Sequence, residues 1–244
     1  IYIEIKNVTP AGYDVYVYGV KDNGSGVNRV QFPTWTEAKG QDDIQPNWQT
    51  GESSKGTKQA DGTTWVYHVN ITDHKTEAGE YNTHIYAYDN LGNGKCIGTQ
   101  KVTIPMVKIT YDENYVKDGT TNKQIVEKVY NTELGTLGTP TRTGYTFAGW
   151  FTEATGGTQI SSTTKTPVTD TTYYAHWNAN PLNFANQTIS KTFSTSEQKA
   201  DITGASNGTG NYTYTEKTEK NSAQEDTNYI SINGTTITIA IKIQ

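Results

Sequence analysis

The residues with the clearest capacity for chemistry lie in the segment FPTWTEAKGQDDIQPNW, residues 32–48, where Asp42 and Asp43 are adjacent and Glu37 precedes them. Two carboxyl groups on opposite sides of a glycosidic bond can hydrolyse it. Side chains of adjacent residues point in divergent directions, and the sequence supplies no obvious second acid for such a pair. In turns an Asp carboxylate accepts backbone N–H groups, and Gly40 permits a turn here. We therefore predict no catalytic residue and interpret the carboxylates as bonded within their own loop.

His74 and His84 offer a second chemistry, because neutral imidazole is a common metal ligand and Asp42 or Asp43 could complete a ligand set. No motif with close ligand spacing joins these residues. Alternation in YNTHIYAY, residues 81–88, divides the side chains between two faces: Tyr81, Thr83, Ile85 and Ala87 on one, and Asn82, His84, Tyr86 and Tyr88 on the other. A histidine bonded to a loop aspartate, locking the loop against a sheet, is the better interpretation, and we predict neither a metal nor a cofactor.

Flat aromatic side chains are the stronger candidates for binding. If Tyr16, Tyr18, Tyr86 and Tyr88 were exposed beside a tryptophan, their rings could stack on a glycan while nearby polar groups bonded its hydroxyls. One face of every strand in a two-sheet sandwich is core, so packing is the competing interpretation for each single ring. The candidate binding residues come from this aromatic set and from the loop with its histidines: Trp35, Gln41, Asp42, Asp43, Trp48, His74, Tyr81, His84, Tyr86 and Tyr88.

These candidates need a scaffold, and the sequence predicts one made of strands. Period-two alternation recurs in IYIEIK, YDVYVYGV, TWVYHVNI, YNTHIYAY, QKVTI, MVKITYD, TTYYAHW and TTITIAIKI. Clusters of Asp, Asn and Gly separate these runs and are typical of turns. No segment has the pattern of a long amphipathic helix. The best helical candidate is KQIVEKVY, residues 123–130, whose apolar positions fit neither period.

Composition limits the classes of protein and partner. Of 244 residues, 33% are hydrophobic, below the average of about 45–50%, and 17 Tyr against 5 Phe indicate half-buried strands. The net charge is −5 and the only arginines are Arg29 and Arg142, which argues against nucleic acid as a partner. Cys96 is the only cysteine, which excludes an intramolecular disulfide and a thiolate metal cluster. No apolar run is long enough to span a membrane, so we expect no direct membrane insertion of this segment.

Two boundaries divide the chain. Ile104-Pro105 closes one run of strands, and the small, polar and proline residues after Trp177 suit a linker. We predict three modules accordingly: residues 1–105, 106–178 and 179–244. The seven or so short strands of the first have the spacing of an immunoglobulin-like sandwich. The chain begins inside an alternating pattern and without Met, so we interpret it as a fragment of a longer protein.

The first module carries a specific pattern: a Ser-Gly-Val turn, Phe-Pro-x-Trp, Gly-Gln-Asp-Asp-Ile and a further Trp, then His, Gly-x-Tyr-Asn-x-His-x-Tyr and Asp-x-x-Gly. Its residues here are Phe32, Pro33, Trp35, Gly40 to Ile44, Trp48, His74, Gly79, Tyr81, Asn82, His84, Tyr86, Asp89 and Gly92. The pattern resembles the group B streptococcal Bsp-like repeat, a module of Gram-positive surface and wall-associated proteins. One departure concerns the loop: the family tends to follow the second Trp with Tyr, whereas Gln49 stands here after an extra QPN.

The other two modules carry resemblances of their own. In the second the relevant residues are Gly144-Tyr145-Thr-Phe147-x-Gly149-Trp150, Gly156-Gly157 and Tyr174-Ala175-x-Trp177. They resemble the Listeria-Bacteroides repeat, a small β-grasp-like unit of bacterial surface proteins, and we expect Trp150 and Trp177 in its core. The third, with PLNFANQTISKTFSTSEQ and YISINGTTITI, is similar to immunoglobulin-like or cadherin-like domains of gut Firmicutes. Such domains continue for one or two further strands, so we expect this module to be incomplete.

The resemblances imply a mostly β chain of three small modules in a row: an immunoglobulin-like β-sandwich, a β-grasp-like repeat and a partial immunoglobulin-like β-sandwich. They imply a non-catalytic, monomeric segment of a secreted or cell-wall-anchored extracellular protein that acts in adhesion or as a stalk. Its partners would be a host surface protein or glycan, or a bacterial cell-wall glycan. The alternative is a glycan- or peptidoglycan-binding accessory region of a larger wall-active enzyme. An enzyme in its own right would need Asp42, Asp43, His74 and His84 to converge in an open pocket.

A covalent feature is a further expectation of the resemblance. Gram-positive surface modules without cysteines sometimes join Lys and Asn side chains in the core, next to an acidic residue. The sequence does not place such a bond, and the intact mass of the chain would reveal it.

Overall fold

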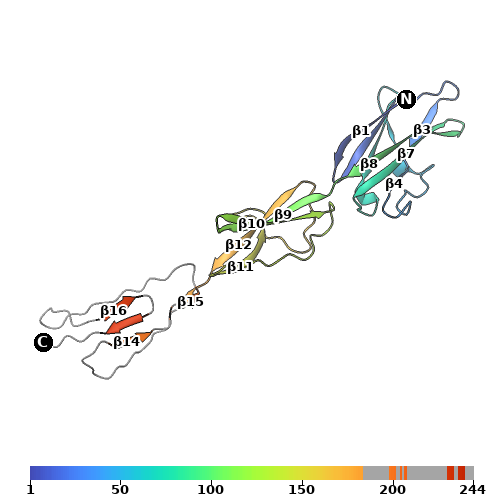
Figure 1. Ribbon diagram of the computed structural model, residues 1–244. Coiled ribbons are helices and arrows are strands. Elements are labelled where there is room, and N and C mark those ends of the chain that lie inside the picture. The colour runs from blue at the N-terminus through green and yellow to red at the C-terminus, as the bar shows by residue number, and fades with distance from the viewer. Residues whose placement is uncertain (184–197, 202–203, 205, 208–229, 234–235, 240–244) are drawn as a thin grey trace, which may run out of the picture. The chain divides into compact units, whose positions relative to one another are not determined.

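The computed structural model describes residues 1–183 together with 198–201, 204, 206–207, 230–233 and 236–239. Strands dominate these residues, and the described helical elements are two short 3₁₀ turns, η1 (Glu52–Ser54) and η2 (Ile71–Asp73) (Figure 1). The chain divides into two compact units, one of residues 1–138 with 149–176 and the other of 139–148 with 177–244. The expected fold class, mostly β with several sheets, is confirmed. The three module boundaries stay predictions.

Two sheets build the first module. Their strands are β1 (Tyr2–Thr9), β2 (Gly12–Tyr18), β3 (Val27–Gln31), β4 (Thr34–Thr36), β5 (Thr57–Lys58), β6 (Trp65–Asn70), β7 (Gly79–Asp89) and β8 (Gly94–Ile104). The first sheet has the order β1-β2-β6-β5, and all its pairs are antiparallel. In the second sheet β8 pairs with β7 along its whole length, so β3 and β4 share the remaining edge of β7. The predicted sandwich follows from these two sheets.

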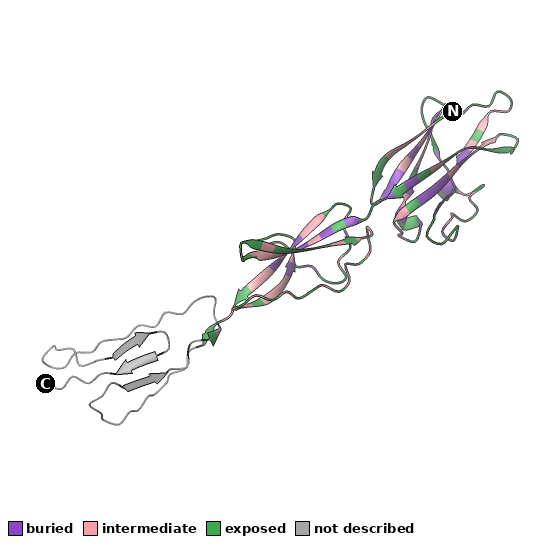
Figure 2. Ribbon diagram, in the orientation of Figure 1, coloured by how far each residue is buried: buried purple, intermediate pink, exposed green. Residues whose placement is uncertain are grey.

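The core of the sandwich follows the alternation of the strands. Every second residue of β2 from Tyr13 to Val17 is fully buried, and Tyr81 and Ile85 of β7 meet them from the other sheet. Figure 2 shows this alternation as buried and partly exposed bands along the same strands. Apolar residues at period two thereby bury one face of each sheet and leave the other to polar and aromatic side chains.

The turn before β2 depends on a glycine. Gly12 has φ of +151°, and a Cβ at this position would lie 1.9 Å from the carbonyl oxygen of Val69 on β6. A side chain there would push β2 and β6 apart. Glycine therefore allows the two strands to pair from the first residue of β2.

The second module contains one mixed sheet in the order β10-β9-β12-β11. Its strands are β9 (Val107–Lys117), β10 (Thr120–Lys128), β11 (Tyr145–Phe151) and β12 (Thr171–Ala179). β9 and β12, which are the first and last strands of this module along the chain, lie side by side at the centre of the sheet and are parallel. The helical candidate at residues 123–130 is wrong: most of it belongs to β10, because the tight turn after Lys117 returns the chain antiparallel to β9. Pairing with a neighbouring strand overrides the ambiguous local pattern.

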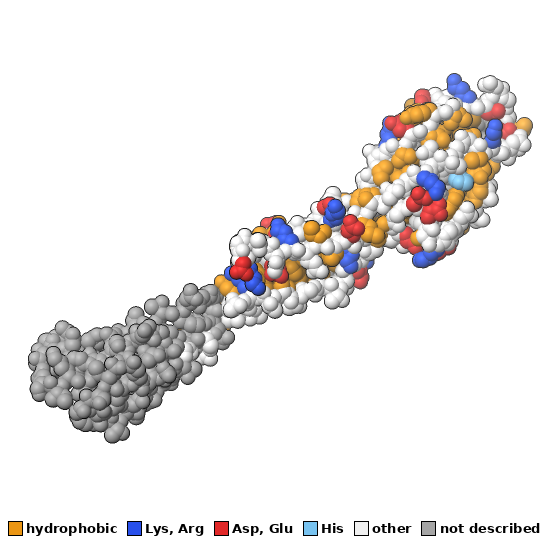
Figure 3. All heavy atoms as spheres, viewed as in Figure 1, with side chains coloured by type: hydrophobic (Ala, Val, Ile, Leu, Met, Phe, Trp, Pro, Cys, Tyr) orange, Lys and Arg blue, Asp and Glu red, His pale blue; other side chains and the backbone are white. Residues whose placement is uncertain are grey.

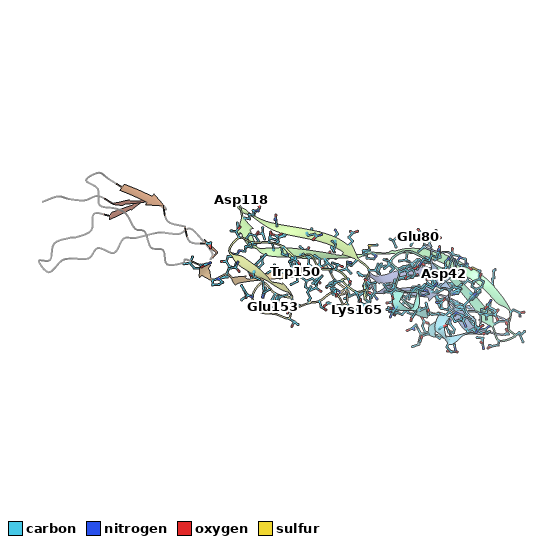
Figure 4. All side chains as sticks on the ribbon, turned by 90° about the horizontal axis from the view of Figure 1, so that it is seen from below. Asp42, Glu80, Asp118, Trp150, Glu153 and Lys165 are labelled. Carbon is cyan, nitrogen blue, oxygen red and sulfur yellow. The ribbon has the colours of Figure 1, made fainter. Side chains whose placement is uncertain are left out.

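Large rings fill the core of this module, as the sequence indicates. Trp150 is 5% exposed, packs edge-on against Tyr111 with ring centroids 5.0 Å apart, and donates its indole N–H to the Gly138 carbonyl at 2.7 Å. Figure 4 labels Trp150, which belongs to β11. Trp177 is half-buried and its ring lies 5.6 Å from that of Phe147. The expectation of a core position therefore fits Trp150 better than Trp177.

The predicted third module falls mostly outside the described residues. Five strands are described in it: β13 (Leu182–Asn183), β14 (Gln198–Asp201), β15 (Ser206–Asn207), β16 (Ile230–Asn233) and β17 (Thr236–Ile239). β13 pairs with β15, and β14-β17-β16 form an antiparallel sheet. The expectation that the third module lacks one or two strands falls outside the described residues and stays a prediction. Across the described ranges, no helix has the length and apolarity needed to cross a membrane.

Candidate binding surface of the first module

Residues 37–51, named here the anchored loop, run along the free edge of β4. Because β7 takes one edge of β4, the N–H groups of Thr34 and Thr36 on the other edge need acceptors. Gln45 Oε1 accepts from Thr34 N–H at 2.8 Å, and both carboxylate oxygens of Asp43 lie 3.1 Å from the Thr36 nitrogen. Two alternate side chains of the loop therefore bond the edge as a neighbouring strand would.

The same loop is tied to the opposite sheet. Gln45 Nε2 donates to the Tyr67 hydroxyl at 2.9 Å, and that hydroxyl donates to the Ser53 carbonyl at 2.7 Å. Ser54 Oγ donates to the Trp48 carbonyl at 2.8 Å. These bonds join the end of the loop to β6 and η1, so the backbone of the loop is held at both ends.

His74 holds the middle of the anchored loop from the core side. Its Nδ1 lies 3.1 Å from the backbone oxygen of Asp43 and 3.4 Å from the carboxylate oxygen Oδ2, and both side chains are 0% exposed. Both partners are acceptors, so Nδ1 carries the proton. Burial lowers the pKa of His74, and the Asp43 charge opposes this shift without reversing it. Nε2 has no hydrogen-bond partner within the described part of the chain, and the ring lies edge-on to Tyr81.

The four residues considered for catalysis do not converge. Asp43 and His74 are buried in the interior, whereas Asp42, labelled in Figure 4, is exposed and bonds Lys75 Nζ at the surface. His84 lies half-buried on the outer face of β7, where burial lowers its pKa. Because the Asp43 and His74 side chains are closed off from solvent, the four groups do not form an open pocket. Within the described ranges no three His, Cys, Asp or Glu side chains gather as a metal-binding group.

A row of aromatic side chains covers the outer face of the second sheet. The rings of Trp35 and His84 are 4.7 Å apart, those of His84 and Tyr86 6.5 Å, and those of Tyr86 and Trp48 4.8 Å. Trp35 is only 9% exposed because its neighbours cover it, whereas Trp48 and Tyr86 are half-buried. Trp48 thus brings the end of the anchored loop onto the sheet, and its ring and that of Tyr86 keep some surface open.

Three other predicted site residues have different surroundings. Tyr81 is fully buried in the core and donates its hydroxyl to the Glu77 carbonyl, so it faces away from any partner. Gln41 is exposed in the loop. Tyr88 lies on the outer face with the Arg29 guanidinium 4.0 Å above its ring. Of the predicted set, Asp43, His74 and Tyr81 are interior and Trp35 is covered by its neighbours, while the others reach the surface at least in part.

The four tyrosines considered for stacking on a glycan, Tyr16, Tyr18, Tyr86 and Tyr88, do not share one surface. Tyr16 and Tyr18 lie on the outer face of the first sheet, where they stack on each other and Tyr18 stacks on Tyr2. Tyr86 and Tyr88 lie on the outer face of the second sheet, and the core separates the two pairs. Alternation predicts which side of a strand a residue occupies, but it does not predict which sheet the strand joins.

Several residues that hold this surface were missed. Gln45 is the most important of them; the period-two spacing of Asp43 and Gln45, equal to that of Thr34 and Thr36, is a signal that could have found it. Glu77 accepts from Thr36 Oγ1 at 2.7 Å and from Lys39 at 3.0 Å, and these bonds lower its pKa. No local pattern predicts these contacts, because Thr36 and Lys39 lie 41 and 38 residues before Glu77 in the sequence.

Several charges on the outer face of the second sheet and its loop are paired with one another. Lys101 bonds Glu37 at 3.1 Å and Glu80 at 2.6 Å, and Asn82 donates to Glu37 at 2.7 Å. The bonds from Asn82 and Lys101 lower the pKa of Glu37, and the carboxylates raise the pKa of Lys101. Figure 3 shows acidic and basic side chains interspersed on the visible face, with no basic stripe of the kind that binds nucleic acid.

Comparison with known proteins locates two repeats in this chain. Residues 2–102 match the family model of the GBS Bsp-like repeat, and residues 108–176 match that of the Listeria-Bacteroides repeat domain. Both families and their order agree with the resemblance found in the sequence. A search of curated proteins gives no match. A crystal structure of a polysaccharide deacetylase from Bacillus cereus aligns with 16% identity and a TM-score of 0.34, over 45% of this chain and 31% of the deacetylase. The chain thus spans under a third of that protein, and the likeness is too low to support an argument.

Proposed function

We propose that this chain, with its two matched repeats, is a non-catalytic segment of a secreted or cell-wall-anchored bacterial surface protein. Its modules act in adhesion and as a stalk, and the first module provides the contact surface. The partner is a host surface molecule. Both family matches support this proposal, because both are repeat domains and the Bsp-like repeat covers the whole first module.

The proposal rests on one observation, the internal bonding of the anchored loop. The side chains with the greatest catalytic potential, Asp43 and His74, are buried and bond each other and the backbone. A buried carboxylate whose two oxygens both face one backbone N–H has a structural task. The loop is thereby rigid and presents its outer residues, among them Asp42 and Trp48, on a fixed frame, which is the arrangement a recognition surface needs.

Display of the chain on a non-adherent carrier bacterium tests this proposal. We expect carrier cells that display it to be retained on immobilised host matrix proteins or epithelial cells, whereas cells with an empty display anchor are washed off. Retention equal to that of the empty anchor would remove the adhesive function. Release of soluble sugar from purified cell wall by the isolated chain would remove the non-catalytic one.

The second candidate function is glycan or peptidoglycan binding. It is favoured by one observation: Trp48 and Tyr86 form a half-exposed aromatic pair beside polar groups of the anchored loop. If this pair binds sugar, Trp48→Ala abolishes saturable binding to purified wall or mucin glycans, while Trp65→Phe, a conservative change in the core, leaves it intact. Failure to bind across a broad glycan array and in a wall pull-down would eliminate this candidate.

A further inference from the structure

A groove lies at the end of the first module where the chain starts and where two loops meet. Its volume is about 220 Å³, and its walls come from Ile1, from the segment between β2 and β3, and from β7, β8 and the turn between them. Figure 1 shows the N-terminus, the start of β3 and the β7–β8 turn at this same end. The groove is distinct from the anchored loop, and no residue of the predicted site except Tyr88 lines it.

The floor of the groove is aliphatic. It consists of side chains of Val20, Val27, Ala87 and Ile97, which belong to the end of the sandwich core or pack against it. Val20 is 3% exposed, so the floor is the outermost layer of the core itself. Covering such a floor with an apolar group removes apolar surface from water and is therefore favourable.

Tyr88, the aromatic residue of the groove, has no free face for a sugar. The Arg29 guanidinium lies 4.0 Å from its ring centroid. The ring also lies so close to Gly94 that a Cβ there would be 2.4 Å from Cε1 of Tyr88. Sugars bind aromatic residues through an open ring face, so an apolar side chain fits this groove better than a pyranose ring.

The two carboxylates at the rim are engaged by their own turns to different degrees. Asp89 accepts from the N–H groups of Leu91 and Asn93 and from the Asn93 side chain, and these bonds lower its pKa. Asp22 accepts from Gly26 N–H at 2.7 Å through Oδ2. Its second oxygen, Oδ1, remains available to accept a hydrogen bond.

Two lysines at the same rim have no such partners. Lys21 and Lys95 are exposed and line the groove, and neither forms an ion pair or side-chain hydrogen bond among the described residues. By contrast, Lys39, Lys55 and Lys101 of the same module are all paired with carboxylates. The groove therefore offers an apolar floor, one free carboxylate oxygen and two unpaired ammonium groups.

We propose that this groove binds a short peptide segment in which an apolar side chain stands next to a carboxylate. The apolar side chain covers the floor, the carboxylate lies between Lys21 and Lys95, and a backbone N–H of the peptide donates to Asp22. The volume is below the range of about 300–1,000 Å³ typical of drug-sized ligand sites, so one side chain and its adjoining backbone fill it. This proposal deepens the adhesive function by naming a protein, through an acidic and apolar segment, as the partner.

The minimal probe of the site is N-acetyl-phenylalanine, which combines one apolar side chain, one N–H and one carboxylate. In an NMR titration of the ¹⁵N-labelled chain we expect saturable shifts of the amides of residues 20–22, 87–89 and 93–97. N-acetyl-phenylalaninamide, which lacks the charge, should bind at least fivefold more weakly. Added salt should weaken the acid more than the amide, because the lysines are exposed.

Variants separate the charge from the fold. Lys21→Gln combined with Lys95→Gln should reduce affinity for the acid to that for the amide, while Lys117→Gln, a matched change of an exposed lysine on β9, should leave it unchanged. The amide spectrum of each variant reports whether it remains folded.

Three outcomes would overturn the proposal. Shifts that do not saturate, or that scatter away from the groove, show that no site exists there. Equal binding of the acid and the amide shows that the lysines do not recognise a carboxylate. Shifts of the same amides by glucuronate and not by N-acetyl-phenylalanine assign the groove to an acidic sugar instead. Each outcome concerns the groove alone, so the retention of displaying cells remains a separate test of adhesion.

Discussion

The carboxylate of Asp43 lies 3.1 Å from the Thr36 nitrogen through both of its oxygens, while Oδ2 is 3.4 Å from Nδ1 of the buried His74. One side chain therefore closes the free edge of β4 and joins the anchored loop to the core. Its neighbour Asp42 lies at the surface. Removal of the Asp43 side chain should therefore destabilise the fold much more than removal of the Asp42 side chain.

Asp43→Ala should destabilise the chain by about 2–3 kcal/mol, because it leaves the buried Thr36 N–H without an acceptor and removes the carboxylate beside His74, whose Nδ1 keeps only the backbone oxygen of residue 43. Asp42→Ala, the matched control, removes one surface ion pair with Lys75 and should cost about 0–1 kcal/mol. Urea unfolding monitored by tryptophan fluorescence measures both values. Equal losses for the two variants would contradict the structural role assigned to Asp43.

The pKa of His74 should make stability depend on pH. Burial lowers that pKa in the folded state, so the neutral ring is the form that fits, and protons bind more tightly to the unfolded chain. The free energy of unfolding therefore has its full value, as far as His74 is concerned, above the unfolded pKa of about 6.5. It decreases as the pH falls from there towards the lower pKa of His74 in the folded state. Urea midpoints between neutral and mildly acidic pH should fall in the parent chain.

Substitution identifies the group responsible for that dependence. His74→Gln should lower stability at neutral pH and flatten the fall below pH 6.5, since the amide does not titrate there. His84→Gln removes a histidine whose pKa is lowered by partial burial, so a smaller change of slope is expected. A slope that persists undiminished in the His74 variant would assign the effect to other groups.

Trp150→Ala should unfold the second module selectively. The indole ring is buried against Tyr111 and bonded to the Gly138 carbonyl, and loss of such a side chain costs about 3–5 kcal/mol. The first module has its own core, so its thermal transition should move far less. A small shift is expected, because Val129 and Tyr130 of the second module pack against that core. Calorimetry resolves the transitions. A common shift of both would show that residues 1–105 and 106–178 unfold as one unit.

The intact mass should show no Lys–Asn cross-link at the site that most resembles one. Lys101 is paired across strands with Asn82, and Glu37 bonds both, yet the Lys101 and Glu37 side chains are 61% and 48% exposed. The Lys101 pKa is raised and that of Glu37 is lowered, so the amine is held as a non-nucleophilic ammonium and the carboxylate as an anion. A mass lower by one ammonia, absent in Lys101→Arg, would disprove this.

Local pattern was sufficient for much of the scaffold. Alternation in residues 81–88 correctly separated Tyr81 and Ile85, which are buried, from His84 and Tyr86 on the outer face. It also predicted β1, β2, β6, β7 and the end of β8 in the first module, but not the short strands β3, β4 and β5. The motif residues identified both repeat families. It failed for residues 123–130, where an indistinct pattern took its structure from pairing with β9. Periodicity is encoded locally, so it can be read wherever one face is clearly apolar.

The sequence alone determined that this chain is built of strands and which side of each strand is apolar, because that information lies in neighbouring residues. Only the tertiary structure decided that Asp43 and Gln45 bond β4, that Tyr16 and Tyr86 belong to opposite faces, and that Lys21 and Lys95 share a groove. Each of these facts depends on which distant segments pair. Sheet pairing is set by contacts far apart in sequence, which no local pattern specifies.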